Sequence, residues 1–143
     1  MVDLWLSHYL REMKTTHALI GAVALAIHGA PRYSADVDLM TLTTDVLHST
    51  FWEGAEVQPS ELRRGDWDDP IAGLVLFPTS EEEIPVELVV GKGYAAKFAI
   101  ESAVMNSQLG CPVVTPLGLA LLKLEAGGTR DLNDIIALQE AQR

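Results

Sequence analysis

Two aspartates in a short apolar run, Asp36-Val37-Asp38-Leu39-Met40, constrain this chain more than any other feature of its sequence. The run is typical of a β-strand, whose side chains alternate between faces, so Asp36 and Asp38 point the same way with Cα atoms roughly 6.5 Å apart. Like charges placed in this way repel each other. Either the pair lies at a solvated strand end or turn, or a bound cation compensates the repulsion.

A third carboxylate, Glu87, lies in the apolar run IPVELVV at residues 84–90. A charged group within an apolar strand is costly unless it is paired or binds a cation, although Glu87 could also be an exposed position on an edge strand. Carboxylates from two adjacent strands can meet at one edge of a sheet. Oxygen ligands of this kind suit Mg2+ or Mn2+ rather than Zn2+, and a pair of such ions is typical of in-line phosphoryl transfer.

Upstream of the aspartates, a short strand at residues 17–20 runs into Gly21 and then into a helix at 22–28. Such a junction presents the unpaired backbone N–H groups of a helix start, which can bind a phosphate. Gly21 permits a close approach or an unusual backbone angle. The junction alone is weak evidence, and it becomes specific because the Asp-x-Asp strand follows it.

The remaining pattern predicts a single domain over residues 1–143 with a mixed α/β or α+β fold around a small sheet. Residues 54–70 are polar and turn-rich and are expected to form a hairpin or loop. Thr115 is the expected N-cap of a helix with Pro116 at its first position, which Gly127 and Gly128 are expected to end. Thr43 or Thr44 is the expected cap of the helix at 45–52, and Asp131 is the expected cap of the last helix. The expected helices are 3–14, 22–28, 45–52, 94–104, 116–126 and 131–141, and the expected strands are 17–20, 36–40, 73–77, 84–90 and 111–114.

Composition narrows the function classes. The net charge of -10 argues against binding of nucleic acid by general phosphate neutralisation, although it is compatible with a local basic site and with cation binding. The single cysteine, Cys111, excludes an internal disulfide and a cysteine-based zinc site. The start of the chain has no basic segment before an apolar core, and no stretch is long enough to span a bilayer. We therefore expect a cytoplasmic protein with no membrane association.

Two stretches carry a resemblance to a known family. LIGAVALAIHGAPRYSADVDLM resembles the opening of the nucleotidyltransferase superfamily shared with DNA polymerase beta, and its H-G-x-x-R-x-S-x-D-x-D-L portion resembles the minimal AbiEii-type enzymes found in toxin–antitoxin and abortive-infection loci. VVTPLGLALLKLEAGGTRDLNDIIALQ is similar to the closing pattern of these enzymes. The resemblance covers about residues 17–139. Its three anchors occur in the expected order: the junction at Gly21, the Asp-x-Asp strand and the closing pattern. It implies a nucleotidyltransferase-like fold.

The resemblance also implies roles for individual residues. Asp36, Asp38 and Glu87 would be the catalytic metal ligands for Mg2+ or Mn2+. The implied nucleotide-binding residues are Gly21, Ala22, Arg32, Ser34, Lys123 and Asp131, and Asp131 with Asp134 would orient Lys123 or pack the last helix. The chain departs from the pattern at Ala22, where a glycine or serine is usual, and at Glu87, where an aspartate is commoner.

The sequence therefore predicts a metal-dependent nucleotidyltransferase that moves a nucleoside monophosphate from a triphosphate such as ATP to an acceptor. The acceptor could be a protein side chain, a tRNA 3′ end or a small molecule. The alternative is a catalytically degenerate module that acts through a protein partner such as a cognate toxin or antitoxin, and a weaker one is a nucleotide sensor. An enzyme would bind triphosphate only with a divalent metal, whereas a module would bind its partner regardless of metal.

Overall fold

The computed structural model describes residues 4–31, 36–81 and 83–143 and confirms the α+β class. Helices and strands alternate only in the first part of the chain, and two 3-10 helices, η1 and η2, lie between the second and third strands. In order, the elements are α1 Trp5–Glu12, β1 His17–Ile20, α2 Gly21–Ile27, β2 Val37–Thr41, η1 Thr44–Leu47, η2 Ser49–Trp52, β3 Glu61–Arg64, β4 Ile71–Leu76, β5 Val86–Gly91, α3 Gly93–Glu101, β6 Val104–Asn106, β7 Cys111–Val113, α4 Pro116–Ala126 and α5 Thr129–Ala141.

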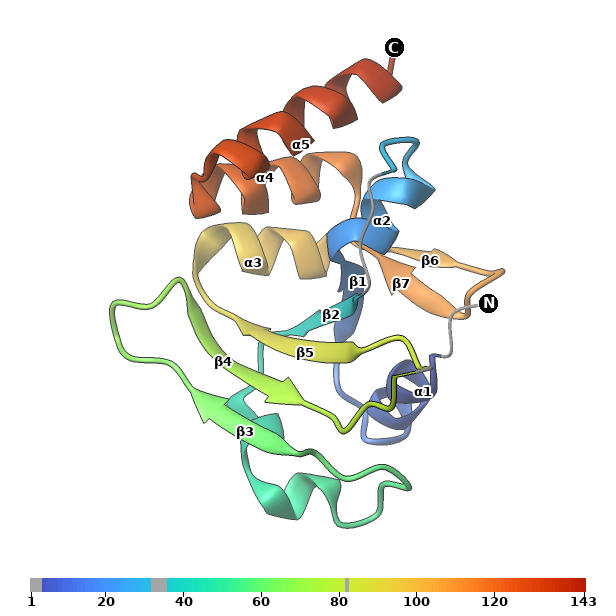
Figure 1. Cartoon of the computed structure of the whole chain (residues 1–143), viewed down its shortest axis with the longest axis vertical. Helices are drawn as coiled ribbons and strands as arrows, with labels where there is room; N and C mark the ends of the chain where they lie inside the picture. Colours follow the sequence, from blue (N-terminus) through green and yellow to red (C-terminus); the bar gives the residue numbers. More distant parts are fainter. Residues whose placement is uncertain (1–3, 32–35, 82) are drawn as a thin grey trace.

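The strands form one mixed sheet of seven in the order β3-β4-β5-β2-β1-β7-β6, which Figure 1 shows as a continuous twisted surface. β2 pairs in parallel with β5 on one side and antiparallel with β1 on the other. β1 also pairs in parallel with β7, and the hairpin partners β3–β4, β4–β5 and β6–β7 are antiparallel. The strand with the two-aspartate motif therefore lies in the middle of the sheet, between β1 and β5.

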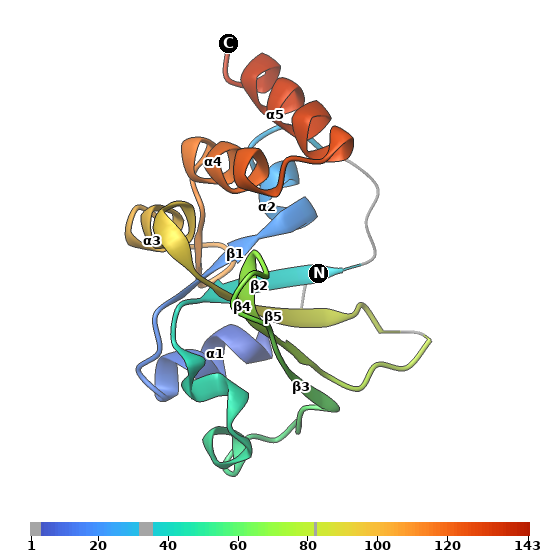
Figure 2. The same cartoon turned by 90° about the vertical axis from the view of Figure 1, so that its left-hand side faces the viewer.

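The helices lie in layers on the two sides of the sheet. Figure 2 shows α2, α3, α4 and α5 on one side and α1 on the other. Leu39 of β2 and Leu88 of β5 are paired in register and have no exposed surface. The flanking residues Asp38 and Glu87 point to the opposite face because strand side chains alternate. The carboxylates of Asp38 and Glu87 thus lie on the face toward α4.

Several local predictions are confirmed. Thr115 caps α4 by accepting a hydrogen bond from the N–H of Gly118 (3.1 Å), and Pro116 is the first residue of the helix. Gly127 ends α4 in the left-handed region, with φ of 71°. Thr43 caps η1 by accepting from the N–H of Asp45. The predicted helix at 45–52 is in fact the two short helices η1 and η2.

Other local predictions are wrong. Asp131 is not the N-cap residue of the last helix, because α5 begins at Thr129 after Gly128. It takes part in the cap from the first turn instead, where it closes a capping box by accepting a hydrogen bond from Gly128 N–H (3.1 Å). β3 and β6 were not predicted: β3 lies in the polar stretch expected to be a hairpin or loop, and β6 begins at the predicted end of a helix. In the described part of the chain, no helix is both long and apolar enough to cross a membrane.

Candidate active site

Three carboxylates come together at the centre of the sheet. Asp38 of β2 lies opposite Glu87 of β5 in the parallel register, and Asp36 immediately precedes β2. One carboxylate oxygen from each of the three residues lies within 4.8 Å of those of the other two, and all three residues are half-buried. The donor set is entirely oxygen, which fits Mg2+ or Mn2+. The predicted grouping of Asp36, Asp38 and Glu87 is present in the fold.

The electrostatics of this cluster favour a cation. Burial, followed by the charges of Glu87 and Asp36, raises the pKa of Asp38 from 3.8 to about 6. Burial and then the charge of Asp36 also raise the pKa of Glu87. Both shifts mean that the ionised carboxylates are destabilised where they lie. A divalent cation reverses that effect because it stabilises the deprotonated forms.

Gly21 lies directly beside the carboxylate cluster. It is the first residue of α2 and has a φ of +70°, a conformation that side-chain-bearing residues rarely adopt. Its neighbour Ile20 is the register partner of Asp38 across β1 and β2. A Cβ atom at Gly21 would lie 2.5 Å from Asp38 Oδ2. The backbone between β1 and α2 can approach the carboxylate closely because residue 21 has no side chain.

Lys123 of α4 is held by two carboxylates of α5. Its Nζ lies 3.0 Å from Asp134 Oδ2 and 3.4 Å from Asp131 Oδ1, and all three side chains are largely buried. Asp131 also accepts a hydrogen bond from Gly128 N–H through its other oxygen, so the same carboxylate fixes the α4–α5 turn. The positive charge of Lys123 is near enough to lower the pKa of Asp38, against the larger effects that raise it.

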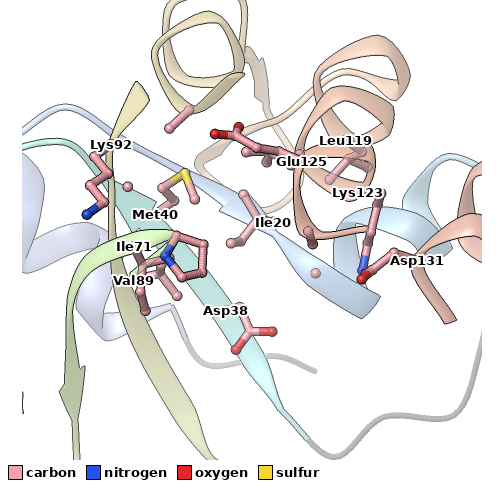
Figure 3. A pocket seen from close by; sticks show the side chains of 16 residues that line it. Ile20, Asp38, Met40, Ile71, Val89, Lys92, Leu119, Lys123, Glu125 and Asp131 are labelled. Atoms are coloured by element: carbon pink, nitrogen blue, oxygen red, sulfur yellow. The ribbon is translucent and has the colours of Figure 1, made fainter. Parts of the chain in front are cut away.

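A cavity of about 290 Å³ connects these groups, and Figure 3 shows Asp38 projecting into it from β2. Lys123 and Asp131 lie beside each other on one side of the cavity, and Lys92 lies on the opposite side. The lining residues come from the sheet, from the end of the β3–β4 hairpin and from α2, α3, α4 and α5: Ile20, Gly21, Asp38, Met40, Pro70, Ile71, Val89, Gly91, Lys92, Ala96, Leu119, Leu122, Lys123, Glu125, Ala126 and Asp131.

The structure brings together most of the predicted residues. Gly21, Asp38, Lys123 and Asp131 line one cavity, which Asp36 and Glu87 adjoin through the carboxylate cluster. Ala22 is buried in α2 and is not among the lining residues. The predicted phosphate contacts Arg32 and Ser34 lie outside the described residues.

Sequence reasoning missed two charged residues of the cavity, Lys92 and Glu125. Lys92 directly follows β5, and its Nζ donates to the backbone carbonyls of Asp66 (3.3 Å) and Trp67 (3.1 Å) in the β3–β4 turn. Glu125 is on the turn of α4 that follows Leu122. A strand-end lysine and a surface helix glutamate carry no local signal of a cavity, because the fold alone brings them to it.

No protein-family model matches the sequence, and no curated protein matches it. Several solved structures resemble the fold, and two of them do so over nearly the whole chain. The lincosamide antibiotic adenylyltransferase LnuA, solved with lincomycin bound, matches with a TM-score of 0.54 and 14% identity over 96% of this chain and 94% of its own. The antibiotic-resistance factor ANT(2'')-Ia matches with a TM-score of 0.55 and 13% identity over 98% of this chain and 82% of its own.

The fold is nucleotidyltransferase-like. At this level of identity the two structures establish the arrangement of the backbone and not the substrate of this chain. Within the nucleotidyltransferase-like fold, this chain carries its own acidic triad of Asp36, Asp38 and Glu87. The fold predicted from the sequence is confirmed, whereas the AbiEii and toxin–antitoxin associations have no support from these comparisons.

Proposed function

We propose that this protein is a metal-dependent nucleotidyltransferase that transfers a nucleoside monophosphate from a nucleoside triphosphate to an acceptor hydroxyl. The observation that carries the proposal is the triad of carboxylates, which converge within 4.8 Å at the centre of a nucleotidyltransferase-like sheet. A half-buried cluster of mutually repelling carboxylates is costly in a fold that binds no cation, and a bound cation offsets that cost.

Asp36, Asp38 and Glu87 would hold Mg2+ or Mn2+. When bound, the ion supplies charge stabilisation for the triphosphate and for the attacking oxygen. The backbone N–H groups of Gly21 and Ala22 are proposed to contact the phosphates beside Asp38, together with Arg32 and Ser34 from the segment before β2. These groups position the substrate and stabilise charge, and no covalent enzyme intermediate is required.

Lys123 is proposed to face the triphosphate from the other wall of the cavity. Its ion pairs with Asp131 and Asp134 fix the direction of a long, flexible side chain before substrate binds. In the reaction, the acceptor oxygen forms a bond to the α-phosphorus, and the bond from that phosphorus to the leaving pyrophosphate breaks. The proton of the acceptor passes to a nearby base, for which the carboxylate of Glu87, opposite Asp38 in the triad, is suitably placed.

A small molecule is the acceptor that the neighbours favour. LnuA is named as an adenylyltransferase of lincosamide antibiotics, and ANT(2'')-Ia as an antibiotic-resistance factor. The net charge of -10 weighs against a tRNA acceptor, since no general basic excess is available to neutralise its backbone. A protein acceptor, and a place in a toxin–antitoxin or abortive-infection pair, stay predictions from the sequence.

The second candidate is a module that retains the fold without catalysis and binds a protein partner. Ala22 favours it, because alanine at the β1–α2 junction provides no hydroxyl to a phosphate. The two functions make opposite predictions about metal. The enzyme binds a triphosphate only with Mg2+ or Mn2+, whereas the module binds its partner in the presence of a chelator.

The deciding experiment is a calorimetric titration with ATP, GTP, CTP and UTP, first with Mg2+ and then with EDTA. The variants are Asp38→Asn and, as the matched control, Asp45→Asn, which removes an exposed carboxylate outside the cavity. We expect metal-dependent binding by the unaltered protein and by Asp45→Asn, and none by Asp38→Asn. If no triphosphate binds under any condition, the enzyme proposal fails and the module becomes the better account.

A further inference from the structure

The cavity beside Asp38 is polar at its sides and apolar between them. Ile20, Met40 and Val89 form a floor on the sheet, and Leu119 and Leu122 of α4 face them across the space. Lys123 and Asp131 mark one side and Lys92 the other, as Figure 3 shows. A cavity with apolar walls and a few convergent polar groups is the usual form of a small-molecule site.

Size limits what can enter. The volume of about 290 Å³ lies at the lower end of the range of ligand pockets. A flat ring system and a sugar fit a space of this order, whereas a folded RNA or a large acceptor does not. Two opposed apolar walls, one from the sheet and one from a helix, also suit a planar group better than a globular one.

Position distinguishes between the two substrates of the proposed reaction. The cavity is lined by Gly21 and Lys123, the residues proposed to contact the phosphates, whereas Glu87 and Asp36 are not among its lining residues. In an in-line displacement, the attacking oxygen approaches opposite the leaving pyrophosphate. The acceptor therefore approaches from the Glu87 side of the triad, and the nucleotide occupies the cavity side.

Resting on the proposed function, we infer that this cavity is the nucleoside pocket and that it favours purine nucleotides. A purine covers more of the apolar floor and roof than a pyrimidine does, and stabilisation by burial grows with the apolar area removed from water. Lys92 and Glu125 add one donor and one acceptor at the rim for the polar edge of the base. The base would lie between β2–β5 and α4, with its phosphates toward Lys123.

The test separates the contribution of the nucleoside from that of the phosphates. Inorganic tripolyphosphate, ATP, GTP, CTP and UTP are each titrated with Mg2+ into the intact chain. The pocket variant is Leu122→Trp, which places a larger side chain in the cavity roof. The matched control is Leu124→Trp on the same helix, where the side chain is 57% exposed and is not part of the cavity lining. Thermal unfolding of each variant confirms that it is folded.

We expect ATP and GTP to bind at least about tenfold more tightly than tripolyphosphate. The affinities of CTP and UTP should lie between that of the purine nucleotides and that of tripolyphosphate. Leu122→Trp should reduce the affinity of every nucleotide to that of tripolyphosphate while leaving tripolyphosphate binding unchanged, and Leu124→Trp should have no effect. The pocket assignment is overturned if the nucleotides bind no more tightly than tripolyphosphate, or if Leu122→Trp leaves their advantage intact. Equal affinity for purines and pyrimidines overturns the purine preference. If none of the four nucleotides binds with Mg2+, the proposed function fails and this inference fails with it.

Discussion

Gly21 and Asp38 are in such close contact that the first cannot carry a side chain without displacing the second. A Cβ atom at Gly21 would lie 2.5 Å from Asp38 Oδ2 and 3.2 Å from Asp38 Cβ. The antiparallel pairing of β1 with β2 fixes this relationship, because Ile20 and Asp38 are register partners. The backbone proposed to bind phosphate and the carboxylate proposed to bind metal therefore form one unit.

Gly21→Ala should consequently disable the site. The new Cβ meets the Asp38 carboxylate, and alanine at φ of +70° also strains the backbone by roughly 1–2 kcal/mol. We expect metal-dependent triphosphate binding to weaken by about tenfold or more, as measured by calorimetry, with a modest loss of thermal stability. Gly54→Ala is the control, since a Cβ there has no neighbour within 4 Å. Equal binding by both variants would contradict the arrangement.

Asp38→Asn should stabilise the metal-free protein while abolishing its response to metal. The folded-state pKa of Asp38 is about 6, against 3.8 as its ordinary value, so ionisation opposes folding at neutral pH by an amount on the order of 3 kcal/mol. Asparagine removes that cost. Thermal unfolding at pH 7.5 should therefore show a higher midpoint for the variant in EDTA, and a Mg2+-dependent increase only for the unaltered protein. A lower midpoint in EDTA would contradict this view of Asp38.

The same shift predicts how pH acts on the metal-free protein. Because the raised pKa lets the folded state bind a proton more readily than the unfolded state, the contribution of Asp38 is most favourable below about pH 4 and is lost as pH rises through about 6. The difference in unfolding free energy between Asp38→Asn and the unaltered protein should therefore grow from pH 4 to pH 6 and then level off. Urea unfolding in EDTA at a series of pH values measures it, and a difference independent of pH would contradict the shift.

Lys123→Met should destabilise the protein and weaken triphosphate binding. The variant leaves Asp134, which is 7% exposed, without its lysine partner, and the expected loss is about 2 kcal/mol or more. The double variant Lys123→Met, Asp134→Asn separates the two effects, because it removes both charges of the ion pair. We expect it to recover most of the stability, measured by urea unfolding, and none of the binding. Recovery of binding would show that Lys123 has only a structural role.

His17 should make the fold sensitive to mild acid. It is buried at the start of β1, its Nε2 lies 2.7 Å from Ser7 Oγ, and its Nδ1 lies 2.9 Å from the Thr15 carbonyl oxygen. Burial lowers its pKa below 6.5, so its contribution is fully present above pH 6.5 and is lost as pH falls below that value. In urea unfolding, His17→Gln should reduce the loss of stability on acidification. His8→Gln, at an exposed histidine, should leave the loss unchanged.

The sequence predicted the triad because each of its members carries a charge within or beside an apolar strand, a cost that local reasoning can recognise. It also predicted α4, because Thr115, Pro116 and Gly127 mark both ends of that helix. The edge strand β3 escaped prediction because its residues, ELRR, lack an apolar pattern and its pairing with β4 is set by the fold. The cavity could not be predicted from the sequence for a similar reason, because the packing of α4 over the sheet creates a space that no single segment encodes.

The strand order has a consequence for how such a protein can diversify. The triad residues lie on or beside β2 and β5, whereas the β3–β4 hairpin forms one margin of the sheet, and the turn between its strands ends at Pro70 on the cavity rim. Loops at such margins tolerate changes in length and sequence far better than central strands do. New substrate preferences can therefore arise by remodelling this hairpin, without disturbing the chemistry at the centre of the sheet.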